Sequence, residues 1–496
     1  MRDKTLLQAL ILGLGQVGAK ILSLIFLFRF SNDLGKEAMS LYVYAYVPFS
    51  IFADLSCFGL IPGTSKLVSR LKGEGEEDKI NYLLKRGTIY SLIAGVGFFL
   101  FMLFFSRQIL SVSLFDGYDN ETFEGVRTNL LFASLSLFVI PIINFYKGFL
   151  QGHLIMYPSC ISIITENVIK ITLYVLLSRY LHDINTIQLV FIIYFSSYFI
   201  SLIILLVFVF PFYFKKKLKF KAVINLLSTS IPFGIATMFF TIYQFIDSIT
   251  LSILLPIEGY YTAYMFETIR LIFFPIVIAQ ALGGALNPKM NYMFKEDKVE
   301  EARGLAKKCS TLIIYILIPL TAVMKYFATD IYNLFYKQEN GAEILYHISD
   351  LILFFGLYKV LIGISLGLPK AHYIIIATIL SAIAKYALNY LLIPHFGYQG
   401  AIYATIIAVS ICILASYYVL FAEKMSLFWV NVKAIIGALF ACFLSVLLVV
   451  IFRVGFYLGA YPAYYSIVLY SILILGVYYL FLKFFRQTKG LLHNIN

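Results

Sequence analysis

Residues 186–212 read TIQLVFIIYFSSYFISLIILLVFVFPF and contain no Asp, Glu, Lys or Arg. An α-helix needs about 20 consecutive apolar residues to cross the hydrocarbon core of a bilayer. This segment is long enough and apolar enough to meet that requirement. The sequence therefore predicts a transmembrane helix here.

The rest of the chain repeats this pattern. It has 496 residues, of which 61% are hydrophobic and 13% charged, a composition too apolar for a soluble core of ordinary proportions. We therefore predict an all-α polytopic membrane protein with about fourteen transmembrane helices. The apolar stretches that predict them are 5–29, 39–61, 84–106, 128–150, 154–178, 186–212, 225–254, 259–286, 306–328, 344–368, 371–394, 399–422, 430–453 and 462–482.

The basic residues between these stretches indicate the orientation of the chain. Lys and Arg concentrate in every second loop, as in 66–86, 215–221 and 289–308, whereas intervening loops carry acids such as Asp116 and Glu121. Loops rich in Lys and Arg stay on the cytoplasmic side of a membrane. The net charge of +13 is therefore interpreted as a topology signal rather than as nucleic-acid binding. We predict a multi-pass protein of the cell membrane with both termini in the cytoplasm.

Two pairs of segments indicate an internal repeat with a period of six helices. Gly59-Leu-Ile-Pro62-Gly-Thr-Ser-Lys66 resembles Gly284-Ala-Leu-Asn-Pro288-Lys289, and Gly152-His153 resembles Ala371-His372. The second pair aligns Glu166 with Lys385 and Lys170 with Asn389. Since six is even, the two halves would have the same orientation, with a substrate cavity between them. The predicted parts are a six-helix lobe 1–214, a six-helix lobe 215–424, and two further helices with a tail in 425–496.

Charged side chains occur inside the predicted helices. Each costs about 2.5 to 3.5 kcal/mol at the centre of a membrane helix, so a group of them favours a water-filled internal path over contact with lipid. The function indicated is movement of a polar substance through the membrane. The residues are Lys20, Asp54, Lys147, Glu166, Lys170, Asp247, Glu267, Arg270, Lys359 and Lys385.

Some of these charges have a simpler explanation within their own helix. Glu166 and Lys170 are four residues apart in the favourable order for a helical ion pair, and Glu267 and Arg270 are three apart. Such pairs are either purely structural or part of a substrate site. Lys147 lies near the cytoplasmic end of its stretch, where a lysine can extend to the headgroups.

The remaining charges supply candidates for a transport site. Lys20, Lys359 and Lys385 have no acid within one helical turn of their own helix. Asp247 is closest in depth to the Glu267 and Arg270 pair and would complete a triad. The substrate-binding candidates are Lys20, Lys359, Lys385, Arg270 and Lys170, and the ion-coupling candidates are Asp54, Glu166, Asp247 and Glu267. We expect no catalytic residue, no metal and no cofactor, and a proton or sodium gradient as the energy source.

The segment Gly13-Leu-Gly15-Gln-Val-Gly18 matches the dinucleotide-binding fingerprint in its letters. That fingerprint works only after a strand in a soluble crossover unit, whereas this one lies in the first predicted membrane helix. The small residues instead thin one side of that helix, which permits close contact with another helix or leaves room for a ligand.

Three segments resemble a known family. They are Phe58–Val68, Gly367-Leu-Pro369-Lys370, and Asn389–Ala401, which reads NYLLIPHFGYQGA. They are similar to the polysaccharide transporter family of the multidrug/oligosaccharidyl-lipid/polysaccharide exporter superfamily, which includes O-antigen and teichoic-acid flippases. The first segment looks most like the stage V sporulation protein B branch.

The resemblance implies a flippase that turns an undecaprenyl-pyrophosphate-linked oligosaccharide from the inner to the outer leaflet. It implies alternating access of two six-helix lobes around a cationic central cavity, for surface polysaccharide biosynthesis. Ammonium and guanidinium groups suit a pyrophosphate. The expected partners are this anionic lipid-linked oligosaccharide, membrane lipids and other polysaccharide-assembly membrane proteins, without nucleic acid.

Three alternatives stay open. A cation-coupled drug exporter would depend on acids such as Asp54, Glu166 or Asp247. A lipid II flippase would carry an arginine-rich signature in its first helix, where this chain has Lys20, Arg29 and Asp33. A membrane polysaccharide polymerase or ligase would need a catalytic constellation, and the sequence shows no nucleophile motif, so we do not expect an enzyme.

Overall fold

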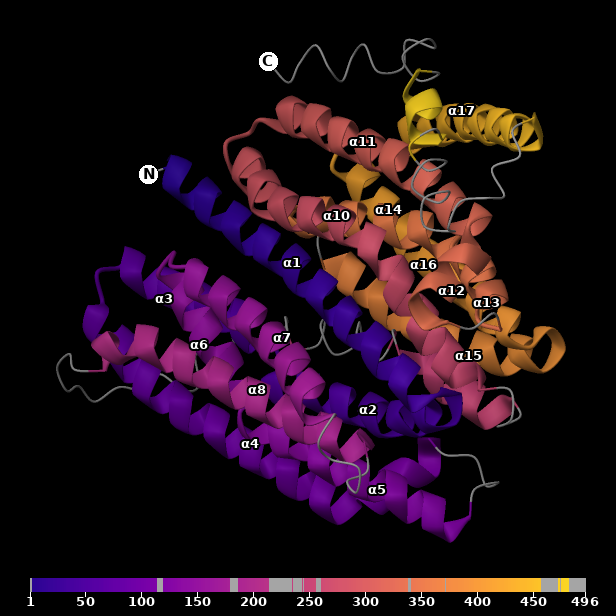
Figure 1. Cartoon of the computed structure of the whole chain (residues 1–496). Coiled ribbons are helices and arrows are strands. Elements are labelled where there is room, and N and C mark those ends of the chain that lie inside the picture. The colour runs from indigo at the N-terminus through magenta and orange to yellow at the C-terminus, as the bar shows by residue number, and fades with distance from the viewer. Residues whose placement is uncertain are drawn as a thin grey trace. The chain divides into compact units, whose positions relative to one another are not determined.

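A computed structural model gives the fold of the protein (Figure 1). It describes residues 2–113, 119–178, 186–213, 234, 243, 245–255, 260–337, 340–370, 372–455, 472 and 474–480. Within these ranges the secondary structure is entirely helical. The prediction of an all-α protein is confirmed.

The chain divides into two compact units, residues 1–263 and 264–496. The predicted lobe limits at 214 and 424 are not tested by this division and stay predictions.

The helices of the first unit pack against one another in one connected group. α1 lies along α7, α7 packs against α8, and α3 packs against α6, as Figure 1 shows in indigo to magenta. Two short 3-10 helices are also present: Leu135–Phe138 between α5 and α6, and Phe210–Phe212 directly after α8. The α-helices are α1 (Arg2–Leu34), α2 (Lys36–Cys57), α3 (Leu60–Gly73), α4 (Glu77–Ser113), α5 (Asn120–Ser134), α6 (Ile140–Gly152), α7 (Tyr157–Leu177) and α8 (Thr186–Val209).

The second unit is built around a central group of helices. α16 packs against both α14 and α15, and α11 packs against α14 and α17. The helices are α10 (Tyr261–Lys295), α11 (Val299–Tyr326), α12 (Ala328–Tyr336), α13 (Ala342–Ile348), α14 (Leu351–Leu366), α15 (His372–Phe396), α16 (Tyr398–Ala422) and α17 (Phe428–Gly455). The first residues of α10 belong to the first unit by the division above.

The described residues include 10 helices long and apolar enough to cross a membrane, or 11 if α13 and α14, bent by 41°, form one span. A polytopic membrane protein is therefore confirmed. The spans counted do not include the stretch 5–29 in α1, and the predicted stretches 225–254 and 462–482 lie largely outside the described residues. The full count of fourteen therefore stays a prediction.

The two segments that resemble each other in sequence are helical rather than loops. α3 follows a break in which Phe58 and Gly59 have φ angles of 24° and 71°, and it buries Leu67, Val68 and Leu71. α10 continues without a break to Lys295. The expectation of loops was wrong because the charged residues of 60–73 occupy one helical face and leave the other apolar.

Both helices end in the same way. The backbone N–H of Glu76 donates to the carbonyl of Leu71, and that of Lys298 donates to the carbonyl of Met293, each at 2.9 Å. The residue before each donor is left-handed, with φ of 74° at Gly75 and 57° at Asp297. This is the Schellman arrangement, which satisfies the last carbonyls of a helix. The resemblance between the two segments therefore extends to their backbone.

Close helix contact in the first unit depends on small residues. A Cβ atom at Gly148 of α6 would lie 2.6 Å from the carbonyl oxygen of Ile61 in α3. A Cβ at Gly15 of α1 would lie 3.1 Å from Cβ of Cys160 in α7. The predicted role of the glycines in the first helix is thus confirmed at Gly15, and the fingerprint of residues 13–18 lies inside α1.

Candidate functional site

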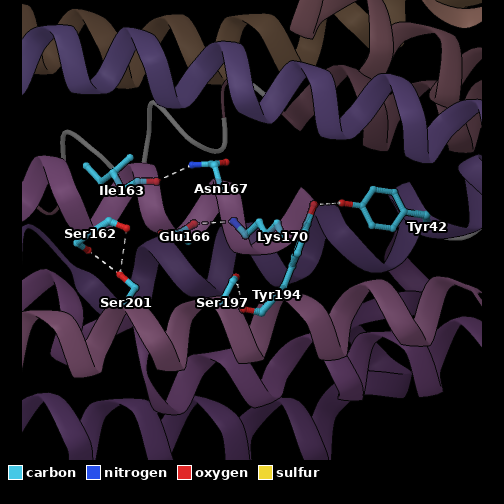
Figure 2. A network of polar contacts seen from close by, with 9 residues as sticks. All are labelled: Tyr42, Ser162, Ile163, Glu166, Asn167, Lys170, Tyr194, Ser197 and Ser201. Atoms are coloured by element: carbon cyan, nitrogen blue, oxygen red, sulfur yellow. Dashed lines mark hydrogen bonds and ion pairs between the residues drawn. The ribbon is translucent and has the colours of Figure 1, made fainter. Parts of the chain in front are cut away.

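The clearest pair of buried charges is in α7. Lys170 Nζ lies 2.6 Å from Oε1 of Glu166, one turn earlier, as Figure 2 shows. Their side chains are only 10% and 12% exposed. The ion pair predicted from their spacing is confirmed.

Two tyrosine rings of α8 face the same lysine. Lys170 Nζ lies 4.8 Å from the ring centre of Tyr194 and 4.6 Å from that of Tyr198. The hydroxyl of Tyr194 is 2.9 Å from that of Tyr42 in α2, which ties three helices together (Figure 2). The sequence analysis did not identify these tyrosines. Their four-residue spacing, which puts both on one face of a helix, was the available signal.

Polar contacts continue along the α7 and α8 interface. Oγ of Ser162 in α7 lies 2.6 Å from Oγ of Ser201 in α8 (Figure 2). Within α7 itself, Nδ2 of Asn167 donates to the carbonyl of Ile163 at 2.8 Å. Small hydroxyl residues let membrane helices approach closely while satisfying each other's hydrogen bonds. The α7 and α8 pair is therefore held by polar contacts as well as by apolar packing.

Lys147 of α6 is also buried, with 7% of its surface exposed. Its predicted extension to the headgroups is wrong, because the surrounding helices enclose the side chain. Asp54 of α2, by contrast, is exposed.

Two other candidates of the first unit lie elsewhere. Lys20 is exposed on α1. Asp247 is 4% exposed and belongs to the first unit, whereas Glu267 and Arg270 belong to the second. The predicted triad of these three residues stays a prediction.

A buried carboxylate marks the second unit. Glu267 of α10 is fully buried, and the hydroxyl of Tyr332 in α12 donates to its Oε2 at 2.5 Å. The hydroxyl of Tyr336, one turn further on, donates to the carbonyl of Glu267 at 3.4 Å. The guanidinium of Arg270 lies 4.4 Å from the ring centre of Phe266. The four-residue spacing of the two tyrosines again gave a signal that the sequence analysis missed.

The position of Tyr332 depends on a glycine. A Cβ atom at Gly341, just before α13, would lie 2.6 Å from Cε1 of the Tyr332 ring. Only a residue without a side chain leaves room for the ring at this place. The short connection between α12 and α13 therefore helps to hold the tyrosine against Glu267.

Lys385 is the most enclosed basic candidate. Only 1% of its surface is exposed, and it lies in the middle of α15, while Lys359 in α14 is partly buried. One turn before Lys385 on the same helix, Oγ of Ser381 lies 3.1 Å from Sγ of Cys412 in α16. A basic side chain buried in an apolar helix is costly, which favours a functional role.

α7 and α15 carry the same polar pattern, which we call the polar stripe of each helix. In both, four residues are spaced so that they share one face. All are buried except Glu166, which is partly buried. The stripes are Ser159, Ser162, Glu166 and Lys170 in α7, and Thr378, Ser381, Lys385 and Asn389 in α15.

Residues 6–290 match the family described as polysaccharide biosynthesis protein. The chain belongs to this polysaccharide biosynthesis family. The lipid II flippase MurJ of Bacillus subtilis is 24% identical over 438 residues, which are 82% of this chain and 80% of that protein. The family resemblance inferred from the three sequence segments is therefore confirmed.

The fold of the chain is similar to those of solved transporter structures. The inward closed conformation of a lipid II flippase MurJ has a TM-score of 0.74 at 16% identity and covers 96% of this chain and 99% of that one. An inward-facing multidrug resistance MATE family transporter of the MOP superfamily has a TM-score of 0.70 at 15% identity and covers 82% and 95%. The chain is thus a multi-pass membrane protein with the fold of this transporter superfamily.

Proposed function

We propose that the protein is a flippase that moves an undecaprenyl-pyrophosphate-type lipid-linked oligosaccharide from the inner to the outer leaflet during surface polysaccharide biosynthesis. The observation that carries the proposal is the burial of Lys385 in the polar stripe of α15. The matching position in the polar stripe of α7 is an acid, Glu166. Membership of the polysaccharide biosynthesis family supports the class of cargo.

The charge of the second unit suits a pyrophosphate. Among the ten span charges singled out from the sequence, this unit holds Glu267, Arg270, Lys359 and Lys385, so basic groups exceed acids in that set. A pyrophosphate loses its hydration when it enters a protein, and ammonium and guanidinium groups offset that loss through charge-assisted hydrogen bonds. The proposal therefore assigns cargo contact first to these three basic residues.

The first unit has a different part in the proposal. Lys170 is engaged with Glu166 and two tyrosine rings, so it has less charge to offer an anion. Lys20 remains a substrate-binding candidate on α1. The acids Asp54, Glu166, Asp247 and Glu267 remain candidates for coupling transport to a proton or sodium gradient.

The test is a flipping assay with the purified protein in proteoliposomes. Fluorescent undecaprenyl lipids carrying a pyrophosphate-linked oligosaccharide, a monophosphate-linked oligosaccharide or no phosphate are placed in the outer leaflet, and loss of access to a quencher is followed. The proposal expects transport of the pyrophosphate lipid at least about tenfold faster than the neutral one, because charged hydrogen bonds contribute about 1.5 to 3 kcal/mol each. Equal rates for all three lipids would overturn it.

A lipid II flippase is the second candidate. It is supported by the 24% identity with the Bacillus subtilis protein and by the 96% coverage of this chain in the structural match. Lipid II added to the same vesicles separates the two: faster flipping of lipid II than of other pyrophosphate-linked oligosaccharides favours this candidate. A cation-coupled drug exporter, the third, would instead accumulate an organic cation dye under an ion gradient.

The proposal places both termini in the cytoplasm and the protein among other polysaccharide-assembly membrane proteins. Single cysteines added at each end, in a variant without its five native cysteines, test the orientation. A membrane-impermeant thiol reagent applied to intact cells should leave both unlabelled. Labelling of either terminus would contradict the topology.

A further inference from the structure

The Lys170 ammonium occupies a place built for an organic cation. A carboxylate and the faces of two aromatic rings are the groups that bind alkylammonium ions in proteins. We infer that Glu166, Tyr194 and Tyr198 form a cation-binding cage whose built-in occupant is Lys170, so that the cage binds a small alkylammonium ion once this side chain is shortened.

The geometry of the cage fits this chemistry. The ammonium nitrogen lies 2.6 Å from the Glu166 carboxylate and 4.8 and 4.6 Å from the ring centres of Tyr194 and Tyr198. All are within the distances at which ion pairs and cation–π contacts act, about 4 Å and 6 Å respectively. The cation therefore contacts one charged group and two π faces at once.

One wall of the cage, Tyr194, is held by partners other than the lysine. The Tyr194 hydroxyl lies 2.9 Å from the hydroxyl of Tyr42, and its ring packs 5.8 Å from Phe26 and 6.3 Å from Tyr46, between ring centres. Tyr198 follows one turn later on the same helix. A site that keeps its shape without its occupant loses less entropy when it binds a replacement.

Burial strengthens the cage. The side chains of Lys170 and Glu166 are 10% and 12% exposed, and Tyr194 is 9% exposed. Attraction between charges increases as solvent is excluded, and cation–π contacts gain in the same way. Tyr198 is only partly buried, which leaves one edge of the cage nearer to the surface.

The second unit contains a matched arrangement in contact with solvent. Lys325 Nζ lies 2.8 Å from Oδ2 of Asp350 and 4.6 Å from the ring centre of Tyr346, but the two charged side chains are 26% and 44% exposed. It has the same three kinds of group with one ring instead of two. Lys325 is therefore the natural control for burial and for the second ring.

The inference concerns cation binding and holds whatever the cargo is. In the native chain Lys170 fills the cage, so external organic cations are excluded from Glu166. A transporter that binds cationic drugs through a buried acid needs that acid to be accessible. The built-in lysine therefore closes this acid to drug-type cations.

The test uses the purified full-length protein in detergent and in nanodiscs. Lys170→Ala removes three methylene groups and the ammonium, a fragment that n-propylammonium reproduces. Propylammonium should raise the melting temperature of this variant and bind it at least about tenfold more tightly than the native protein. Neutral 1-propanol should have no such effect, and Lys325→Ala should respond to propylammonium no more than the native protein does.

A second variant isolates the carboxylate. Glu166→Gln/Lys170→Ala keeps both rings but removes both charges, and it should bind propylammonium about tenfold more weakly than Lys170→Ala. If Lys170→Ala folds only when propylammonium is present during purification, that rescue also supports the cage. The inference is overturned if no alkylammonium ion stabilises or rescues Lys170→Ala, or if the double variant binds equally well.

Discussion

The polar stripes of α7 and α15 have the same spacing but differ in charge. In α7 the third position is Glu166 and the fourth is Lys170, which neutralise each other at 2.6 Å. In α15 the same positions hold Lys385 and Asn389, a charge and a neutral amide. One fold thus carries a balanced pair in one unit and a net positive charge in the other.

This difference separates structural charges from functional ones. A balanced buried pair can be replaced by apolar residues at little cost, whereas breaking it leaves a single buried charge. A lysine buried in an apolar helix is costly to keep, which favours a functional role such as the proposed contact with an anionic cargo. We therefore expect the larger stability effects from the charges of α7 and the larger effects on cargo binding from Lys385 of α15.

The largest stability effect is expected from Lys170→Met. It leaves the Glu166 carboxylate buried without its lysine and should lower the free energy of unfolding by about 3 to 5 kcal/mol. Glu166→Gln/Lys170→Met removes both charges and should recover most of that loss. Unfolding in mixed detergent micelles measures the free energy of unfolding of both variants. An equal decrease in the two would show that the stability lost in Lys170→Met does not come from the unpaired Glu166 charge.

Glu267 extends the comparison to a carboxylate that meets a hydroxyl instead of a lysine. Tyr332→Phe removes the donor at 2.5 Å and should destabilise the protein by about 1.5 to 3 kcal/mol, because the lost hydrogen bond is to a charged group. Tyr336→Phe is the control, since its hydroxyl reaches a backbone carbonyl at 3.4 Å, and should cost about 0.5 to 1 kcal/mol. Similar losses would mean that the carboxylate does not depend on Tyr332.

The smallest effect is expected at the second position of each stripe. Ser162→Ala loses a 2.6 Å contact between hydroxyls and should cost about 0.5 to 1.5 kcal/mol. Ser381→Ala loses a 3.1 Å contact with the thiol of Cys412 and a 3.1 Å hydrogen bond to the carbonyl of Thr378 one turn earlier. It should cost no more than Ser162→Ala, because sulfur is a weak hydrogen-bonding group and the second bond lies within its own helix. A larger loss at Ser381 than at Ser162 would show that the stripes are not equivalent.

Patterns within a single helix were predictable from the sequence. The four-residue spacing of Glu166 and Lys170 predicted their ion pair, and the alignment of the repeat placed Lys385 and Asn389 at matching positions. The family resemblance followed from short segments such as 58–68. These inferences need only the periodicity of one helix and the order of residues.

Contacts between helices were not predictable in the same way. Tyr42 and Tyr194 meet although 152 positions separate them, and nothing in the local pattern specifies which helices pack together. The burial of Lys147 depends on the helices around α6. Its position near the end of an apolar stretch had instead indicated that the side chain extends to the headgroups. The helical segment 60–73 was missed because its charged face resembles a loop in composition.

The most direct test of the account is flipping of a pyrophosphate-linked oligosaccharide lipid by the Lys385→Met protein in proteoliposomes. The account predicts a rate at least about tenfold below that of the native protein, since one charge-assisted contact is lost. Lys385→Arg should retain most of the rate, and Lys325→Met, which alters the solvent-exposed pair with Asp350, should match the native protein. A folded Lys385→Met protein that flips the lipid at the native rate would contradict the central claim.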